Sequence, residues 1–167
     1  MSMVIFLADR GHIQTRGVHV RIKNRFQSDG DFSTVQFRAT SPREPGPYRV
    51  EAKTDPRTLL GEDSYPVTDA RIEVGFAPGG QGRRDRYWFN WVEPERNFLL
   101  GWHQDSGHPA LGPVHVQVNQ HDAVIEREAA SFIDKHPMAV TEARLAQLRD
   151  ALASVQWTDG AVSGIDW

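Results

Sequence analysis

The chain has 167 residues, of which 39% are hydrophobic and 25% are charged, and its formal net charge is −3. A chain of this length buries roughly 70% of its unfolded surface, which is enough for one hydrophobic core. The absence of cysteine excludes disulfides, thiol nucleophiles and thiolate zinc sites. No apolar run approaches the about 18 residues of a membrane helix, and the N-terminal residues do not form a signal peptide. We therefore expect one cytoplasmic domain, residues 1–167, with no membrane contact.

Alternating apolar and polar residues predict strands in the N-terminal third. Residues 18–23 alternate valine and isoleucine with histidine, arginine and lysine, which predicts a half-buried strand with a basic outer face. A turn-forming stretch at 27–31 and a second alternating run at 34–40 predict that these strands form a hairpin. A short strand is expected at 48–53, so that residues 1–53 form an N-terminal hairpin region.

The middle of the chain predicts an antiparallel run of strands with short links. Residues 54–69 contain two prolines and a glycine without a clear period, so we expect an irregular connection with at most one helical turn. The glycine-rich stretch 78–82 is expected to form the tip between two strands. The strands predicted in this part are 70–76, 87–92, 97–104 and 114–120.

Only the C-terminal part predicts helices. A short helical piece is expected at 126–135, ending before Pro137. A longer helix is expected at 141–157, because leucines recur along one stripe and Thr141 is a suitable cap. Residues 157–167 are expected to be a tail. The predicted fold class is α+β: a curved antiparallel sheet of about six to eight strands with the C-terminal helix packed on one face.

Three histidines mark the part of the sequence that is richest in chemistry. His103 ends one predicted strand, His108 lies in the following loop, and His115 lies on the next strand. If the two strands pair, the three imidazoles meet near the loop. Histidine titrates near neutral pH, so such a group can supply the general acid and base for cleavage of RNA through its 2′-hydroxyl. We therefore interpret His103, His108 and His115 as catalytic candidates.

The second half of the chain resembles the TumE family of toxin–antitoxin proteins over about residues 70–156. The segments that carry the resemblance are Ala-Arg-Ile-Glu-Val at 70–74, Arg-Tyr-Trp-Phe at 86–89, Leu-Leu-Gly-Trp at 99–102, His-Pro at 108–109, and His115. The resemblance implies a partner antitoxin, and its RelE-like relationship implies RNA as the target.

The chain departs from the family pattern at several positions. Gly101 stands where the family has a basic residue, and His103 and Gln104 stand where an acid and an amide are expected. Val-Gln at 116–117 replaces the Lys-His that follows the last histidine. The chain is also extended at its N-terminus, so the resemblance implies a divergent relative.

Several side chains near these strands are expected to bind RNA. The arginines beside the glycine-rich tip suit phosphate, and the aromatic strand that follows offers a ring on which a base can stack. The residues that we expect to bind RNA or phosphate are Arg83, Arg84, Arg86, Trp88 and Gln117.

Two alternatives remain open. The three histidines with Asp105 or Asp122 could coordinate zinc, iron or manganese, but the spacings of five and seven residues match no standard ligand motif. We therefore expect no metal and no cofactor. The other alternative is a non-catalytic module that binds protein or nucleic acid and whose histidines are structural. The oligomeric state is left open.

Overall fold

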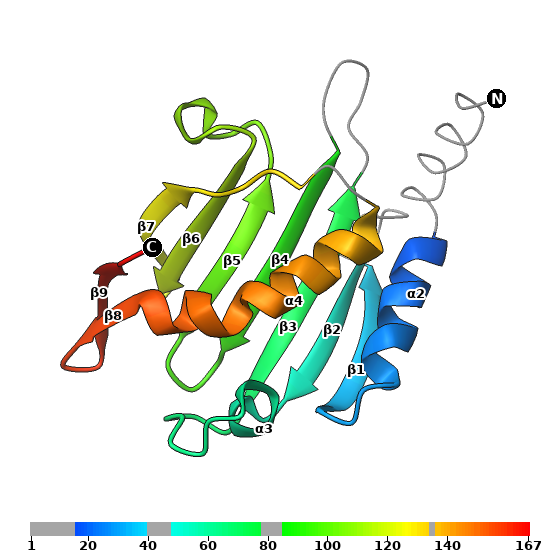
Figure 1. Ribbon diagram of the computed structural model, residues 1–167, viewed down its shortest axis with the longest axis horizontal. Coiled ribbons are helices and arrows are strands. Elements are labelled where there is room, and N and C mark those ends of the chain that lie inside the picture. Colours follow the sequence, from blue (N-terminus) through cyan, green and yellow to red (C-terminus); the bar gives the residue numbers. More distant parts are fainter. Residues whose placement is uncertain (1–15, 40–47, 78–84, 134–135) are drawn as a thin grey trace.

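In the computed structural model of the chain, residues 16–39, 48–77, 85–133 and 136–167 are described. Seven strands form one antiparallel sheet, and their order across the sheet is their order along the chain (Figure 1). The predicted α+β class is therefore confirmed. The strands are β1 (Phe32–Ala39), β2 (Tyr48–Thr54), β3 (Ala70–Ala77), β4 (Arg86–Glu93), β5 (Phe98–Gln104), β6 (Val114–Gln120) and β7 (Ala123–Ala129).

A tight turn joins β6 to β7. His121 and Asp122, with φ of 51° and 63°, form the two-residue link between β6 and β7. Positive φ at both central residues is typical of the turn type that matches the twist of a hairpin. The predicted helical turn in the connection 54–69 is confirmed, as α3 (Pro56–Leu60).

The helix α4 (Pro137–Ser154) crosses one face of the sheet (Figure 1). Arg144 on α4 is 1% exposed and donates to the hydroxyl of Tyr87 on β4 at 2.8 Å. The prediction of a C-terminal helix is confirmed, but its bounds were wrong. The helix begins before Thr141 because Pro137 occupies its first turn and His136 Nδ1 accepts from the Met138 amide at 3.3 Å. It ends before Val155, which begins another strand.

The predicted strand at 18–23 is wrong, because this segment lies in the helix α2 (Arg16–Gln27). Val18, Ile22 and Phe26 are at most 1% exposed and are four residues apart, so they share one helix face. Residues four apart lie on one face of a helix, but they also lie on one face of a strand, so the alternating pattern did not distinguish the two. Val20, expected inside, is 37% exposed, whereas His19 is buried and its Nε2 accepts from the Phe76 amide at 3.2 Å.

The consequence for the N-terminal region is a different hairpin. The run at 34–40 does not pair with 18–23. Its residues 34–39 belong to β1, and β1 pairs with β2. Figure 1 shows α2 lying along these two strands at one edge of the sheet.

Two predictions at the C-terminal end are also wrong. The described part of the piece at 126–135, residues 126–133, is not helical: Ala123–Ala129 forms β7, since the outer edge of β6 offers backbone hydrogen-bonding groups that a strand satisfies and a helix does not. The tail at 157–167 is a second hairpin, formed by β8 (Val155–Thr158) and β9 (Ala161–Ile165). It is tied to β7 by the Ile165 amide, which donates to Glu126 Oε2 at 2.8 Å.

The strand period of two gives the sheet two different faces. Side chains such as Val74, Phe89, Trp102 and Val116 point toward the helices and are at most 1% exposed. The alternate side chains lie on the opposite face, which no helix covers among the described residues, and this surface is called the open face below. No helix in the described part of the chain is long and apolar enough to cross a membrane.

Candidate functional site

The open face carries polar side chains that the strand register places next to one another. Trp88, His103 and His115 are partners across β4, β5 and β6. Directly paired side chains of an antiparallel sheet lie about 5 Å apart, so these three residues form one row. The next row on the same face contains Asn90 and Gln117, with Gly101 between them.

The three predicted histidines lie together at the end of this row. The ring centroids of His103 and His115 are 5.4 Å apart, and those of His108 and His115 are 4.8 Å apart. The rings are almost perpendicular in both pairs. Asp105 joins them: one potential ligand atom each from His103, Asp105 and His115 lie within 4.8 Å of one another. These four residues are called the histidine cluster.

His103 is held in place by a neighbour on β4. Its Nε2 lies 2.8 Å from Asn90 Oδ1, and since an amide oxygen can only accept, Nε2 carries the proton and Nδ1 keeps its lone pair. Gly101 makes this contact possible. A Cβ at Gly101 would lie 2.1 Å from Asn90 Oδ1 and 3.0 Å from His103 Nε2, so a side chain there would displace the hydrogen bond.

The surroundings favour neutral imidazoles in the cluster. Burial, reinforced by the charge of His115, lowers the pKa of His103 to about 4 from its ordinary value of 6.5, although Asp105 acts in the other direction. Burial also lowers the pKa of His115, which is 1% exposed. Nε2 of His115 is buried and has no hydrogen-bond partner among the described residues. The two imidazoles are thus uncharged at pH 7 and one has an unused nitrogen.

The loop between β5 and β6 supplies the other two members of the cluster. Asp105 Oδ1 accepts from the Gly107 amide at 2.8 Å, which leaves Oδ2 available. His108 precedes a short 3-10 turn, Pro109–Leu111, and is half-buried at the edge of the cluster. The loop thus places His108 against His115 and leaves it in contact with solvent.

A second polar chain runs beside the cluster on β6 and β7. Arg127 Nε donates to Gln117 Oε1 at 3.0 Å, and Gln117 Nε2 donates to Asn119 Oδ1 at 3.2 Å. Gln117, predicted to bind RNA, thus belongs to this series of hydrogen-bonded side chains and is 8% exposed. Arg127 was missed because its segment was expected to be helical. Asn90 was missed too, although a polar residue inside an aromatic strand was a usable indication.

The other predicted RNA-binding residues are spread along β4 and its preceding loop. Trp88 is half-buried beside His103, and its ring covers Gly75, where a Cβ would lie 2.0 Å from Trp88 Cζ2. Arg86 is exposed at the start of β4, and the alternation of the strand puts it on the open face. Arg83 and Arg84 lie outside the described residues.

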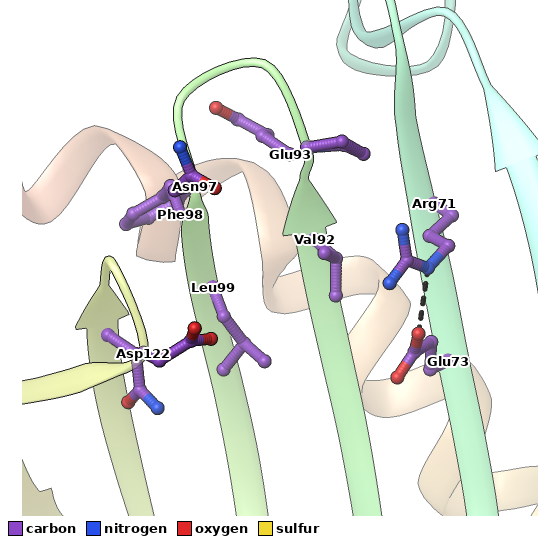
Figure 2. Close-up of a pocket in the computed structure, with 10 residues that line it drawn as sticks. Arg71, Glu73, Val92, Glu93, Asn97, Phe98, Leu99 and Asp122 are labelled. Atoms are coloured by element: carbon purple, nitrogen blue, oxygen red, sulfur yellow. Dashed lines mark hydrogen bonds and ion pairs between the residues drawn. The ribbon is translucent and has the colours of Figure 1, made fainter.

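A separate pocket of about 320 Å³ lies at the opposite ends of the same strands. Figure 2 shows its ion pair, in which Arg71 Nε lies 2.7 Å from Glu73 Oε1, facing Val92 and Leu99. Asp122 lines this pocket rather than the histidine cluster. Of the two aspartates considered as metal ligands, Asp122 therefore lies away from the histidines, and Asp105 lies next to them.

Comparison of the chain with protein-family models, with curated proteins and with solved structures gives no match. The resemblance to the TumE family therefore stays a prediction from the sequence, and the functional argument depends on the site.

Proposed function

We propose that this protein is a TumE-like component of a toxin–antitoxin or related defence module in the cytoplasm, and that its histidine cluster cleaves RNA. One observation carries the proposal: His103, His108 and His115, separated along the chain, meet on an open sheet face with ring centroids 5.4 and 4.8 Å apart. Cleavage through a 2′-hydroxyl requires proton acceptors and donors at one place, and imidazoles are the side chains best suited to this near pH 7.

The surroundings of the cluster support RNA as the substrate. Trp88 lies next to His103 in the row and offers part of a ring on which an unpaired base can stack. Arg86 is exposed on the same strand, and its guanidinium suits a phosphate. A base on Trp88 would place the adjoining phosphodiester near the imidazoles, because paired side chains lie about 5 Å apart.

The three histidines differ in their access to a substrate. His115 is 1% exposed, whereas His108 is half-buried at the edge of the cluster and touches the His115 ring. We assign to His108 the proton transfers with RNA: it takes the proton of the 2′-hydroxyl as the 2′-oxygen bonds to phosphorus, and it returns a proton to the 5′-oxygen as the bond from phosphorus to that oxygen breaks. His103 and His115 form the inner part of the site and set the position of the reacting phosphate.

Cleavage of a labelled single-stranded RNA by the purified protein, together with growth after induction in cells, tests this proposal. The variant His108→Gln should lose about 100-fold or more in cleavage rate, the lower end of typical acid–base contributions, and His103→Gln and His115→Gln should lose a similar factor because the phosphate is no longer held in position. His121→Asn is the matched control, since His121 is exposed in a turn with positive φ that asparagine tolerates. Unchanged cleavage in the three cluster variants, or no cleavage by the parent protein, would refute the proposal.

The strand β7 favours a second function, binding of a partner protein. In the described sheet β7 pairs only with β6, and Val124 and Ile125 are 38% and 41% exposed. An edge strand with exposed apolar residues is suited to the addition of a strand from another chain, such as the antitoxin expected from the resemblance. Ile125→Lys should weaken co-purification of a protein encoded by the adjacent gene and leave RNA cleavage unchanged. Equal co-purification with this variant would exclude this edge.

A further inference from the structure

We propose that His103, Asp105 and His115 bind a divalent transition-metal ion, for which zinc is the reference. The observation is geometric: two imidazoles and one carboxylate, contributed by β5, the loop after it and β6, place their potential ligand atoms within 4.8 Å of one another. This site goes beyond the proposed function, because zinc binding can be measured without RNA.

The donor set selects the class of metal. Two nitrogen donors and one oxygen donor suit zinc, iron or cobalt, whereas magnesium and calcium prefer oxygen ligands throughout. Ligand atoms around tetrahedral zinc lie roughly 3.4 Å apart, as follows from metal–ligand distances near 2.1 Å. The largest spacing in the cluster, up to 4.8 Å, exceeds this value by about 1.4 Å, so the side chains must approach one another when the metal binds. Asp105 lies in the loop after β5, where rotation of its side chain can contribute to this approach.

A buried atom in the cluster lacks a partner that a metal would supply. Nε2 of His115 makes no hydrogen bond to any described residue, although His115 is 1% exposed. Buried polar atoms normally have a partner, so an unmatched one needs a physical explanation. A cation beside Asp105 provides it, because a neutral imidazole nitrogen is a good ligand for zinc.

The surroundings of His103 have the form of a metal-ligand support. Metal-binding histidines commonly donate their second ring nitrogen to an oxygen acceptor, which fixes the ring and its tautomer. Here that acceptor is Asn90 Oδ1, 2.8 Å from His103 Nε2. Gly101 leaves space for this hydrogen bond, since a Cβ there would lie 2.1 Å from Asn90 Oδ1. Asn90, by its hydrogen bond, and Gly101, by its lack of a side chain, thus both fix the orientation of the His103 imidazole.

His108 is outside the ligand set and keeps its role in the proposed function. It contacts the His115 ring from the loop and is half-buried. Zinc held by the other three residues therefore leaves one imidazole free for proton transfer. His108→Gln should lose RNA cleavage while it retains zinc, which separates the two proposals experimentally.

Calorimetric titration of the full chain with zinc chloride, after removal of metals with EDTA, tests the site. The parent protein should bind one zinc ion per chain, and a tenfold excess of magnesium should not compete. His103→Gln and His115→Gln should weaken binding by about 100-fold or more, and Asn90→Ala by about 10- to 100-fold as expected for loss of a supporting contact. His121→Asn should match the parent.

Asp105→Asn keeps the test valid if a histidine variant fails to fold, because Asp105 lies outside the strands and is only half-buried. It should weaken zinc binding by about 10-fold or more while thermal unfolding without metal stays close to that of the parent. Cobalt should give the visible absorption of a four- or five-coordinate ion in the parent and not in Asp105→Asn. The proposal is overturned if the parent binds no zinc, or if Asp105→Asn binds it as tightly as the parent does.

Discussion

The two faces of the seven-stranded sheet use the same backbone for different purposes. On β5, Leu100 and Trp102 point toward the helix-covered core and are fully buried, while Leu99 and His103, which flank this pair, lie on the open face. The helix-covered face removes large apolar surfaces from water, which is the main source of stability. The open face buries less apolar surface and carries the polar groups instead. Stability and chemistry are therefore assigned to alternate residues of the same strands.

The open face is itself divided. On β1 to β3 several of its charges form ion pairs: Glu51 lies 3.1 Å from Arg38 and 2.7 Å from Arg49, and Arg71 pairs with Glu73. On β5 and β6 the corresponding positions carry His103 and His115, and Nε2 of His115 is left without a partner among the described residues. A ligand is more readily accommodated where polar atoms are unmatched. The difference between these halves locates the site on the histidine side.

The largest expected effect compares two adjacent leucines of β5. Leu100→Ala creates a cavity against the helix-covered core and should lower the free energy of unfolding by about 2–5 kcal/mol. Leu99→Ala, on the half-buried open face, should cost about 1 kcal/mol or less, because its side chain gains less from burial. Urea denaturation of both variants provides the measurement. Similar losses in the two proteins would mean that the open face is covered in solution.

The pH dependence of stability tests the inner histidine of the open face. His103 has a pKa of about 4 in the folded protein against an ordinary 6.5, so the unfolded chain takes up the proton first. The free energy of unfolding should therefore be unaffected above about pH 6.5 and fall as the pH decreases toward 4. The fall is about 3 kcal/mol at most, and less with partial solvent screening.

Denaturation at several pH values in the presence of EDTA measures this effect. His103→Gln removes one titrating group and should make the curve less steep between pH 6.5 and 4, with the contribution of His115 remaining. An equally steep curve in that variant would assign the acid sensitivity to other groups.

The sequence predicts the open-face histidines better than it predicts the N-terminal region, and one physical difference explains this. The spacing of Val114, Val116 and Val118 fits a strand and also, through Val114 and Val118, one helix face, and pairing with β5 and β7 on both sides selects the strand that places His115. At Val18 and Ile22 the same residue types satisfy both periods, and only the packing of α2 on the sheet selects the helix.

The residues that surround the histidines were harder to predict from the sequence. Asn90 and Gly101 act through a contact between strands, which depends on the register of β4 with β5 and not on local sequence. The contribution of Asp105 depends on the path of a loop. Arg127 became visible only when its segment proved to be a strand.

A smaller effect is expected from Gly101→Ala, which tests whether this glycine shapes the site. The added Cβ would lie 2.1 Å from Asn90 Oδ1, so the Asn90–His103 hydrogen bond should break at a cost of about 1–3 kcal/mol. RNA cleavage should fall with it, because His103 loses its fixed orientation. Gly30→Ala is the matched control, since nothing lies within 4 Å of its Cβ position. Wild-type cleavage by Gly101→Ala would show that the position of His103 is not critical.

The smallest effect is expected from the Arg71–Glu73 ion pair at the far end of the open face (Figure 2). Its Arg71 side chain is 33% exposed, so a double-mutant cycle with Arg71→Ala and Glu73→Gln should give a coupling of about 1 kcal/mol or less. Neither variant should change RNA cleavage if the reacting site is confined to the histidine half. A loss of cleavage with Arg71→Ala at unchanged stability would instead extend the RNA path along the strands, because the arginine would then bind a phosphate distant from the scissile bond.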